Sequence, residues 1–157
     1  MVKARARHNM ISKMYIRDGR APIPKKEVTS RVMSSIRAKN TKPERALRKA
    51  LCDSGLKGYR LHWDRAPGRP DICYPGKKMA IFVHGCYWHR CPHCKPSMPK
   101  SHALFWRNKF KLNKERDRRK EMDLINSGWR VITFWECQLE KNAGSCVRRV
   151  YNALGEL

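Results

Sequence analysis

Residues 80–94 read Ala-Ile-Phe-Val-His-Gly-Cys-Tyr-Trp-His-Arg-Cys-Pro-His-Cys, so an apolar run typical of a buried strand ends in a group of cysteines and histidines. A strand must pair within a sheet, and three cysteines and three histidines this close together can hold a metal, transfer protons, or do both. The stretch therefore predicts that the chemistry of this protein is located at the end of a buried strand.

The chain has a strong positive charge. Its 36 Lys and Arg against 13 Asp and Glu give a formal net charge of +23 over 157 residues. This predicts a polyanionic partner, nucleic acid above all, although composition alone also allows non-catalytic RNA binding. We expect no membrane partner, because the sequence has no long apolar segment. Seven cysteines, an odd number, and no apolar signal-peptide core predict a reduced cytoplasmic protein associated with the nucleoid.

The length predicts one domain and a tail. Residues 1–28 are basic with few core-sized side chains, which predicts a flexible arm that follows phosphates. Residues 29–157 predict an α/β domain in which helices flank a small mixed sheet. Helices are expected over 29–37, 42–54, from His102 to about 126 with Ser101 as its cap, and 144–154, and strands over 59–63, 71–74, 79–83 and 129–135.

Two turns join the middle strands and predict a hairpin. In an antiparallel pair, Asp71 at the start of one strand and His84 at the end of the next reach the same sheet edge, where they can share a metal or a phosphate. Glu44 has the position of a capping-box glutamate behind Thr41, and the same side chain could face an active site.

The cysteines have the spacing of a zinc site. Cys86, Cys91 and Cys94 lie in one loop, and Cys137 can complete a tetrahedral set if its strand lies beside residues 79–83. A set of four protein ligands leaves no open position, so this zinc would hold the loop. His93 competes with Cys94 as the third ligand, and a redox Cys-x-x-Cys is the alternative use of Cys91 and Cys94.

If the cysteines bind zinc, His84 and His89 are free for acid–base work near two carboxylates, Asp71 and Asp117. A carboxylate that joins Mg²⁺ to a phosphate, with an imidazole that takes a proton from water, makes a workable hydrolase.

Five ordered motifs carry a resemblance to a known family. They are Pro-Gly-Arg-Pro-Asp71, Phe-Val-His84-Gly-Cys86-Tyr-Trp-His89, Phe105-Trp106-x2-Lys109, Asn113-x2-Arg116-Asp117-Arg-Arg, and Gly128-Trp-Arg-Val through Trp135-Glu-Cys137. Over about residues 29–139 the chain resembles the very short patch repair endonucleases. The resemblance implies a restriction endonuclease-like fold for the domain over 29–157. It also implies a Mg²⁺-dependent nick in one strand beside the thymine of a T:G mismatch.

The resemblance also implies roles for individual residues. Asp71 matches the family's metal-binding aspartate, His84 and His89 its active-site histidines, Asp117 the acid that orients the catalytic histidine, and Glu44 a glutamate near that site. Without the resemblance, an ordinary ion pair with a neighbouring arginine would be the preferred interpretation of Asp117.

Four apolar or aromatic residues match those that the family inserts into DNA beside the mismatch. They are Tyr87, Trp88 and Trp106, with Met33 entering from the opposite groove. We assign Trp129 and Trp135 to the core. Double-stranded DNA with a T:G mismatch is the implied partner of a monomeric protein, and mismatch-repair proteins are further partners to test.

Several positions depart from related patterns. Phe82-Val83-His84 stands where restriction enzymes carry an acid and a lysine, a loss that the family shares. Val83 replaces a threonine found in some relatives, and Cys91 stands where a zinc-binding histidine occurs. Two alternatives to mismatch nicking follow from the same residues. They are a restriction-like nuclease of the same fold and a non-catalytic, zinc-stabilised nucleic-acid-binding protein.

Overall fold

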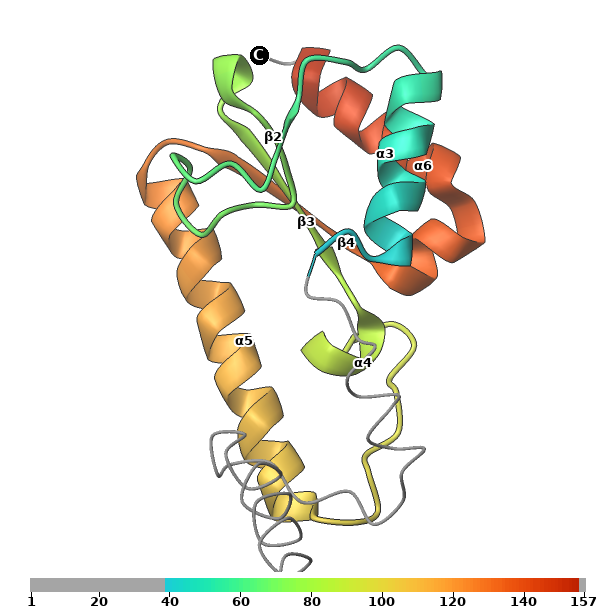
Figure 1. Ribbon diagram of the computed structural model, residues 1–157, viewed down its shortest axis with the longest axis vertical. Coiled ribbons are helices and arrows are strands. Elements are labelled where there is room, and N and C mark those ends of the chain that lie inside the picture. Colours follow the sequence, from blue (N-terminus) through green and yellow to red (C-terminus); the bar gives the residue numbers. More distant parts are fainter. Residues whose placement is uncertain (1–38, 156–157) are drawn as a thin grey trace, which may run out of the picture.

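The computed structural model describes residues 39–155, which form a mixed sheet with helices on both faces (Figure 1). The strand order is β1-β2-β3-β4, with bounds β1 (Arg60–Leu61), β2 (Ile72–Tyr74), β3 (Met79–His84) and β4 (Arg130–Trp135). Neighbours from β1 to β3 are antiparallel, whereas β3 and β4 are parallel. The predicted α/β class, the mixed sheet and the hairpin over 71–83 are confirmed.

Some predictions lie outside the described residues. These are the basic arm over 1–28, the helix over 29–37 and the placement of Met33. Within residues 39–155, no helix combines the length and the apolar character needed to cross a lipid bilayer.

The helices form two layers around the sheet. α3 (Lys42–Asp53) and α6 (Glu136–Gly155) pack on one face, and α5 (Ala103–Asn126) lies on the other (Figure 1). The short elements are η1 (Pro75–Lys77) and α4 (Cys86–His89), the latter directly after β3. Side chains of β3 alternate between the layers. Met79, Ile81 and Val83 join the core of α3 and α6, and Ala80 and Phe82 join that of α5. β3 is therefore buried on both faces, as its apolar sequence predicts.

α3 begins and ends where its sequence predicts. Thr41 Oγ1 accepts from the Glu44 amide, and the Glu44 carboxylate accepts from the Thr41 amide, which completes a capping box. Gly55 follows the helix at a φ of 76°, a left-handed value that glycine adopts without steric cost.

Three predicted boundaries are wrong. Residues 59–63 alternate like a half-buried strand, but β1 contains only Arg60 and Leu61, both exposed at the sheet edge. Ser101 does not cap α5, because His102 is the N-cap residue, at a φ of 53° and without a side-chain cap. α6 begins at Glu136, directly after β4, and its kink at Asn142 precedes the predicted start. The Asn142 side chain accepts from the Ser145 amide at 2.9 Å, so it caps the second half of the helix.

Gly68 lies in the turn that leads to β2, and it provides a first test of the packing. Its φ is +72°, and a Cβ there would lie 2.8 Å from Lys120 Cβ and 3.3 Å from Lys120 Cα on α5. We expect Gly68→Ala to lower the free energy of unfolding by roughly 2–4 kcal/mol, since left-handed strain and a clash add. Chemical denaturation measures this change.

Gly58→Ala is the matched control. Its φ is +87°, but no atom lies within 4 Å of the added Cβ. We expect Gly58→Ala to lower the free energy of unfolding by only about 1 kcal/mol. Equal losses in the two variants would contradict the close approach of this turn to α5.

Candidate active site and sulfur cluster

An open cleft of about 1120 Å³ lies beside the end of β3 and reaches α3, α4 and α5. All five residues predicted to be catalytic line it: Glu44, Asp71, His84, His89 and Asp117. Basic side chains share the cleft wall, namely those of Lys42, Arg45, Arg69, Arg116 and Lys120. The structure therefore places the predicted acids and histidines in one cleft that also attracts anions.

Asp71 is held at the cleft by the pairing of β2 with β3. Its Oδ2 accepts from the Val83 amide at 2.8 Å. Burial raises the pKa of Asp71 to about 6, and the nearby Glu44 carboxylate adds to the shift, which the Val83 hydrogen bond opposes. This carboxylate is thus poorly solvated, and a cation beside it would stabilise its charged form.

His89 and Asp117 form a close pair. Nδ1 of His89 lies 2.5 Å from Oδ2 of Asp117, although α4 and the middle of α5 are far apart in sequence. Burial would raise the pKa of Asp117, but the hydrogen bond and the charge of His89 outweigh it and lower the pKa overall. An ionised carboxylate on Nδ1 fixes the imidazole so that Nε2 is the atom available for proton transfer.

The His84 ring stacks on that of His89, with centroids 4.1 Å apart and an interplanar angle of 8°. Burial lowers the pKa of His84 to about 4, and the proximity of His89 acts in the same direction. Burial therefore disfavours the charged form of His84, whose ring lies flat against that of His89.

The Glu44 carboxylate caps the N-terminus of α3 and also lines the cleft. It accepts from Asn40 N at 3.0 Å, Thr41 N at 3.3 Å and Thr41 Oγ1 at 2.8 Å, and only 4% of the residue is exposed. These donors hold the carboxylate in a fixed position beside Asp71.

The sequence analysis did not single out His62 or Glu136. The ring of His62 lies between the carboxylates of Glu44 and Asp71, with Nε2 3.5 Å from Glu44 Oε2 and Nδ1 3.7 Å from Asp71 Oδ1. Glu136 lines the cleft and accepts from the Cys86 amide at 3.1 Å. The Trp-Glu-Cys motif was the available signal for Glu136, whereas no local sequence pattern indicated that His62 approaches Asp71.

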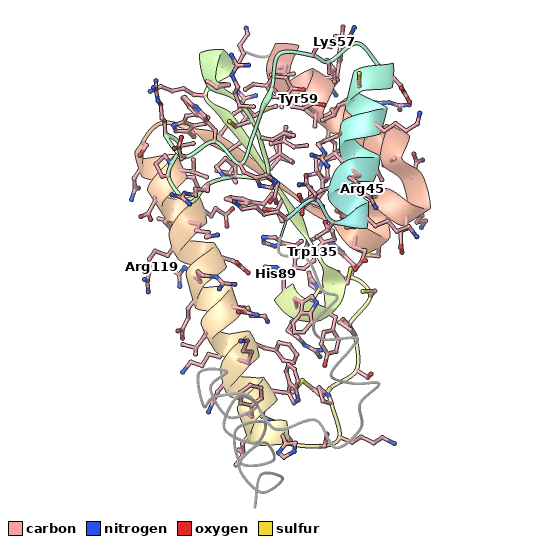
Figure 2. All side chains as sticks on the ribbon, in the orientation of Figure 1. Arg45, Lys57, Tyr59, His89, Arg119 and Trp135 are labelled. Atoms are coloured by element: carbon pink, nitrogen blue, oxygen red, sulfur yellow. The ribbon has the colours of Figure 1, made fainter. Side chains whose placement is uncertain are left out.

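Trp135 was assigned to the core, and this assignment is wrong. Its half-buried ring packs edge-on against His84 with centroids 5.3 Å apart. Figure 2 shows Trp135 and His89 close together near the end of the sheet. The indole therefore forms part of the wall around the stacked histidines.

The four predicted cysteines meet at the other side of α4. One sulfur from each of Cys86, Cys91, Cys94 and Cys137 lies within 4.8 Å of the others. The parallel pairing of β3 with β4 explains this meeting. His84 lies opposite Trp135, so the segments that follow the two strands leave the sheet side by side. The exposed His93 lies outside the sulfur cluster, with its Nε2 3.4 Å from Gln138 Nε2. Four clustered sulfurs could hold a metal ion.

One face of α5 changes character along its length. At a spacing of three and four residues it presents Trp106, Phe110, Asn113, Asp117, Lys120 and Leu124, all buried or half-buried. The two ends of this α5 stripe are apolar and its middle is polar. Asn113 donates to the Trp88 carbonyl at 3.1 Å, which ties α4 to the helix above Asp117.

The aromatic residues predicted to contact DNA form a half-buried cluster between α4 and the start of α5. The centroid of Tyr87 lies 5.1 Å from that of Trp88 and 6.3 Å from that of Trp106. Trp106 also stacks on Phe110 with centroids 5.7 Å apart. These rings are thus supported from one side and accessible from the other.

Comparison with known proteins identifies relatives of this chain. The family model described as DNA mismatch endonuclease Vsr matches residues 22–95. The chain is 41% identical over 123 residues to the type II nicking enzyme V.XorIIP of Xanthomonas oryzae pv. oryzae, a match that covers 78% of this chain and 89% of the relative. It is 38% identical over 120 residues to the DNA mismatch endonuclease Vsr of Escherichia coli K12, with 76% of each chain covered.

The chain belongs to the Vsr family. It is therefore a DNA endonuclease, and the alternative of a non-catalytic nucleic-acid-binding protein is excluded. The type II nicking enzyme V.NmeAIP of Neisseria meningitidis is 40% identical over 126 residues, with 80% of this chain and 89% of the relative covered. The names of these Vsr relatives support a DNA-nicking activity for this chain.

Proposed function

We propose that this Vsr-family endonuclease uses Mg²⁺ to nick one strand beside the thymine of a T:G mismatch. The main support is the His89–Asp117 pair, which lies in the same basic cleft as Asp71. Further support comes from the relative in Escherichia coli, whose name specifies a DNA mismatch endonuclease.

Asp71 and Glu44 fit a Mg²⁺ site. Both are carboxylates with restricted positions, and Mg²⁺ binds to one or two carboxylates together with substrate phosphates. When bound, the ion stabilises negative charge on the scissile phosphate. Asp71 supplies the principal ligand, and Glu44 assists from the N-terminus of α3.

His89 is the general base in this proposal. Its Nε2 accepts a proton from the attacking water, while Asp117 holds Nδ1–H and stabilises the imidazolium that forms. The neutral ring of His84 stacks against His89 and keeps it in plane. Trp135 and Glu136 position this group from the β4 side.

The aromatic cluster is proposed to detect the mismatch. Tyr87, Trp88 and Trp106 enter the base stack, where a weak pair costs less to separate. Met33 enters from the opposite groove. Basic residues of α5 contact phosphates, and Figure 2 shows Arg119 on the outward side of this helix.

The sulfur cluster is proposed to hold structural zinc. Two ligands of a tetrahedral zinc site with bonds of about 2.3 Å lie about 3.8 Å apart. Sγ of Cys91 lies 3.7 Å from Sγ of Cys137, which fits this separation. The ion would link α4, the following loop and the start of α6. We also propose that residues 29–157 form the endonuclease domain, with a restriction endonuclease-like sheet.

A nicking assay tests the function. We expect the full chain with Mg²⁺ to cut one strand of a T:G duplex at least about 100-fold faster than the matched C:G duplex, because inserting side chains into a paired stack costs a few kcal/mol more. Strand-labelled oligonucleotides resolved on a denaturing gel give both rates. Equal cutting of the two duplexes would contradict mismatch recognition. Cutting of both strands of the C:G duplex would favour a restriction-like nuclease.

A further inference from the structure

His62 occupies an unusual place behind the catalytic carboxylates. It follows β1 with a φ of 46°, a left-handed conformation that is uncommon for residues other than glycine. Its amide donates to the Asp71 carbonyl at 3.3 Å, and only 16% of its side chain is exposed. The backbone therefore fixes the ring between Glu44 in α3 and Asp71, the residue directly before β2.

Hydrogen bonds do not account for the positions of the two ring nitrogens of His62. The distance from Nε2 to Glu44 Oε2 is 3.5 Å, and that from Nδ1 to Asp71 Oδ1 is 3.7 Å. Protein N–H···O hydrogen bonds fall at about 2.7–3.2 Å, so both contacts are long. Within residues 39–155, Nε2 of His62 is the buried side-chain polar atom that has no hydrogen-bond partner. Such an atom is costly to leave unpaired and needs an explanation.

Each distance lies within the range for two donors that share an ion, although the two distances involve different ring nitrogens and only one nitrogen can bind a given ion. Ligands about 2.1–2.2 Å from an octahedral divalent ion lie roughly 3.0–4.4 Å from one another. One donor atom from each of Glu44, His62 and Asp71 lies within 4.8 Å of the others. Small movements of the ring would bring one nitrogen and two oxygens to a common centre.

Hydrogen bonds from backbone amides fix the orientation of the two carboxylates towards His62. Oδ2 of Asp71 accepts from Val83 N, which leaves Oδ1 on the side of His62. Glu44 is held by the amides of Asn40 and Thr41, and its Oε2 faces the ring. Two acids and one imidazole therefore converge with little freedom to reorient.

We propose that His62 is a nitrogen ligand of the divalent-metal site at Asp71. The assignment rests on the proposed function, which places the metal at this aspartate. A nitrogen donor favours transition-metal ions such as Mn²⁺ over Mg²⁺, compared with a site made of oxygen alone. His62 thus sets which divalent ion the endonuclease binds most tightly.

Mn²⁺ serves as the probe, with the full chain kept zinc-loaded. Electron paramagnetic resonance of free Mn²⁺ gives the affinity, and pulsed measurements detect coupling between bound Mn²⁺ and a histidine nitrogen. We expect nitrogen coupling in the unmodified protein. In His62→Gln we expect the coupling to disappear and the Mn²⁺ affinity to fall by about 10- to 100-fold, with a smaller change for Mg²⁺. His102→Gln, an exposed histidine at the start of α5, is the matched control and should retain both.

Three outcomes overturn the assignment. Absence of nitrogen coupling in the unmodified protein does so without any variant, which covers the case of a poorly folded His62→Gln. Unchanged coupling and affinity in His62→Gln, together with loss of Mn²⁺ binding in Asp71→Asn, would limit His62 to bracing the carboxylates. Mn²⁺ binding that survives Asp71→Asn would overturn the proposed metal position as well.

Discussion

Asp71→Asn is expected to reduce nicking by at least about 1000-fold and to stabilise the Mg²⁺-free protein. The loss of activity follows from removing the proposed principal ligand of the metal ion, since metal stabilisation of a phosphate transition state contributes several kcal/mol. The gain in stability follows from the environment of Asp71, whose pKa is raised from 3.8 to about 6 by burial and by Glu44. Asparagine keeps an oxygen that can accept from Val83 and removes the poorly solvated charge.

The sign of the pH dependence follows from this shift. The folded state holds its proton more tightly than the unfolded state, so stability is lost as pH rises from 3.8 to about 6 and is constant above that. The Asp71→Asn variant does not undergo this loss of stability. Its stability therefore equals that of the unmodified protein near pH 3.8 and exceeds it by the full amount above pH 6. Because part of the side chain remains accessible to water, we expect a gain of about 1–2 kcal/mol at pH 8.

Thermal denaturation at pH 4 and pH 8 without Mg²⁺ measures the stability, and the T:G nicking assay measures the rate. Asp64→Asn is the control, because Asp64 is exposed in the same connection between β1 and β2. It should change neither quantity. Nicking within tenfold of the unmodified rate would contradict the metal-ligand role of Asp71, and an unchanged midpoint at pH 8 would contradict its buried charge.

Cys137→Ser is expected to release zinc and to disable the site from outside the cleft. Cys137 is the second residue of α6, and its amide donates to Cys86 Sγ at 3.4 Å. Cys86 lies three residues before His89, so loss of the ion would free the segment that carries the proposed general base. We expect the free energy of unfolding to fall by several kcal/mol. At roughly 2–4 °C per kcal/mol, this lowers the midpoint of thermal denaturation by about 10 °C. Nicking should fall at least about 100-fold.

Elemental analysis of zinc, thermal denaturation and nicking rates together measure this effect. Cys52→Ser is the control, because Cys52 is exposed at the end of α3, away from the sulfur cluster. His93→Gln should also keep its zinc, whereas Cys94→Ser should lose it, since Cys94 is the residue within the sulfur cluster. One zinc per chain in Cys137→Ser, or none in the unmodified protein, would contradict the proposed ligand set.

Local patterns predicted a large part of the fold. The capping box at Thr41 and Glu44, the apolar run of β3 and the hairpin after Asp71 each depend on residues close in sequence. The meeting of Cys86 with Cys137 could be predicted because parallel strands deliver their following residues to one edge. Nothing in residues 39–155 tests the predictions for the basic arm or Met33.

The wrong or missed predictions concern residues whose positions depend on contacts between segments far apart in the sequence. His62 approaches Asp71 only after β1 pairs with β2 and the backbone turns left-handed, and no periodicity indicates this. Trp135 was assigned by its apolar character, but it follows the buried Phe134 and therefore points to the opposite face, towards His84. The start of α6 was missed because β4 continues directly into it, and Trp135 stands where a capping Ser, Thr, Asp or Asn would signal a helix. The Gln138 side chain provides the cap instead, accepting from the Trp135 amide at 3.1 Å.

The α5 stripe makes helix length itself part of the active site. Trp106 and Asp117 are eleven residues apart, about three full turns, so they point in nearly the same direction. One residue inserted between them would rotate Asp117 by about 100° relative to Trp106 and withdraw it from His89. Substitutions on the outward face leave this relation intact. We therefore expect α5 to tolerate exchange of residues better than insertion or deletion of a residue between the aromatic cluster and the proposed catalytic pair.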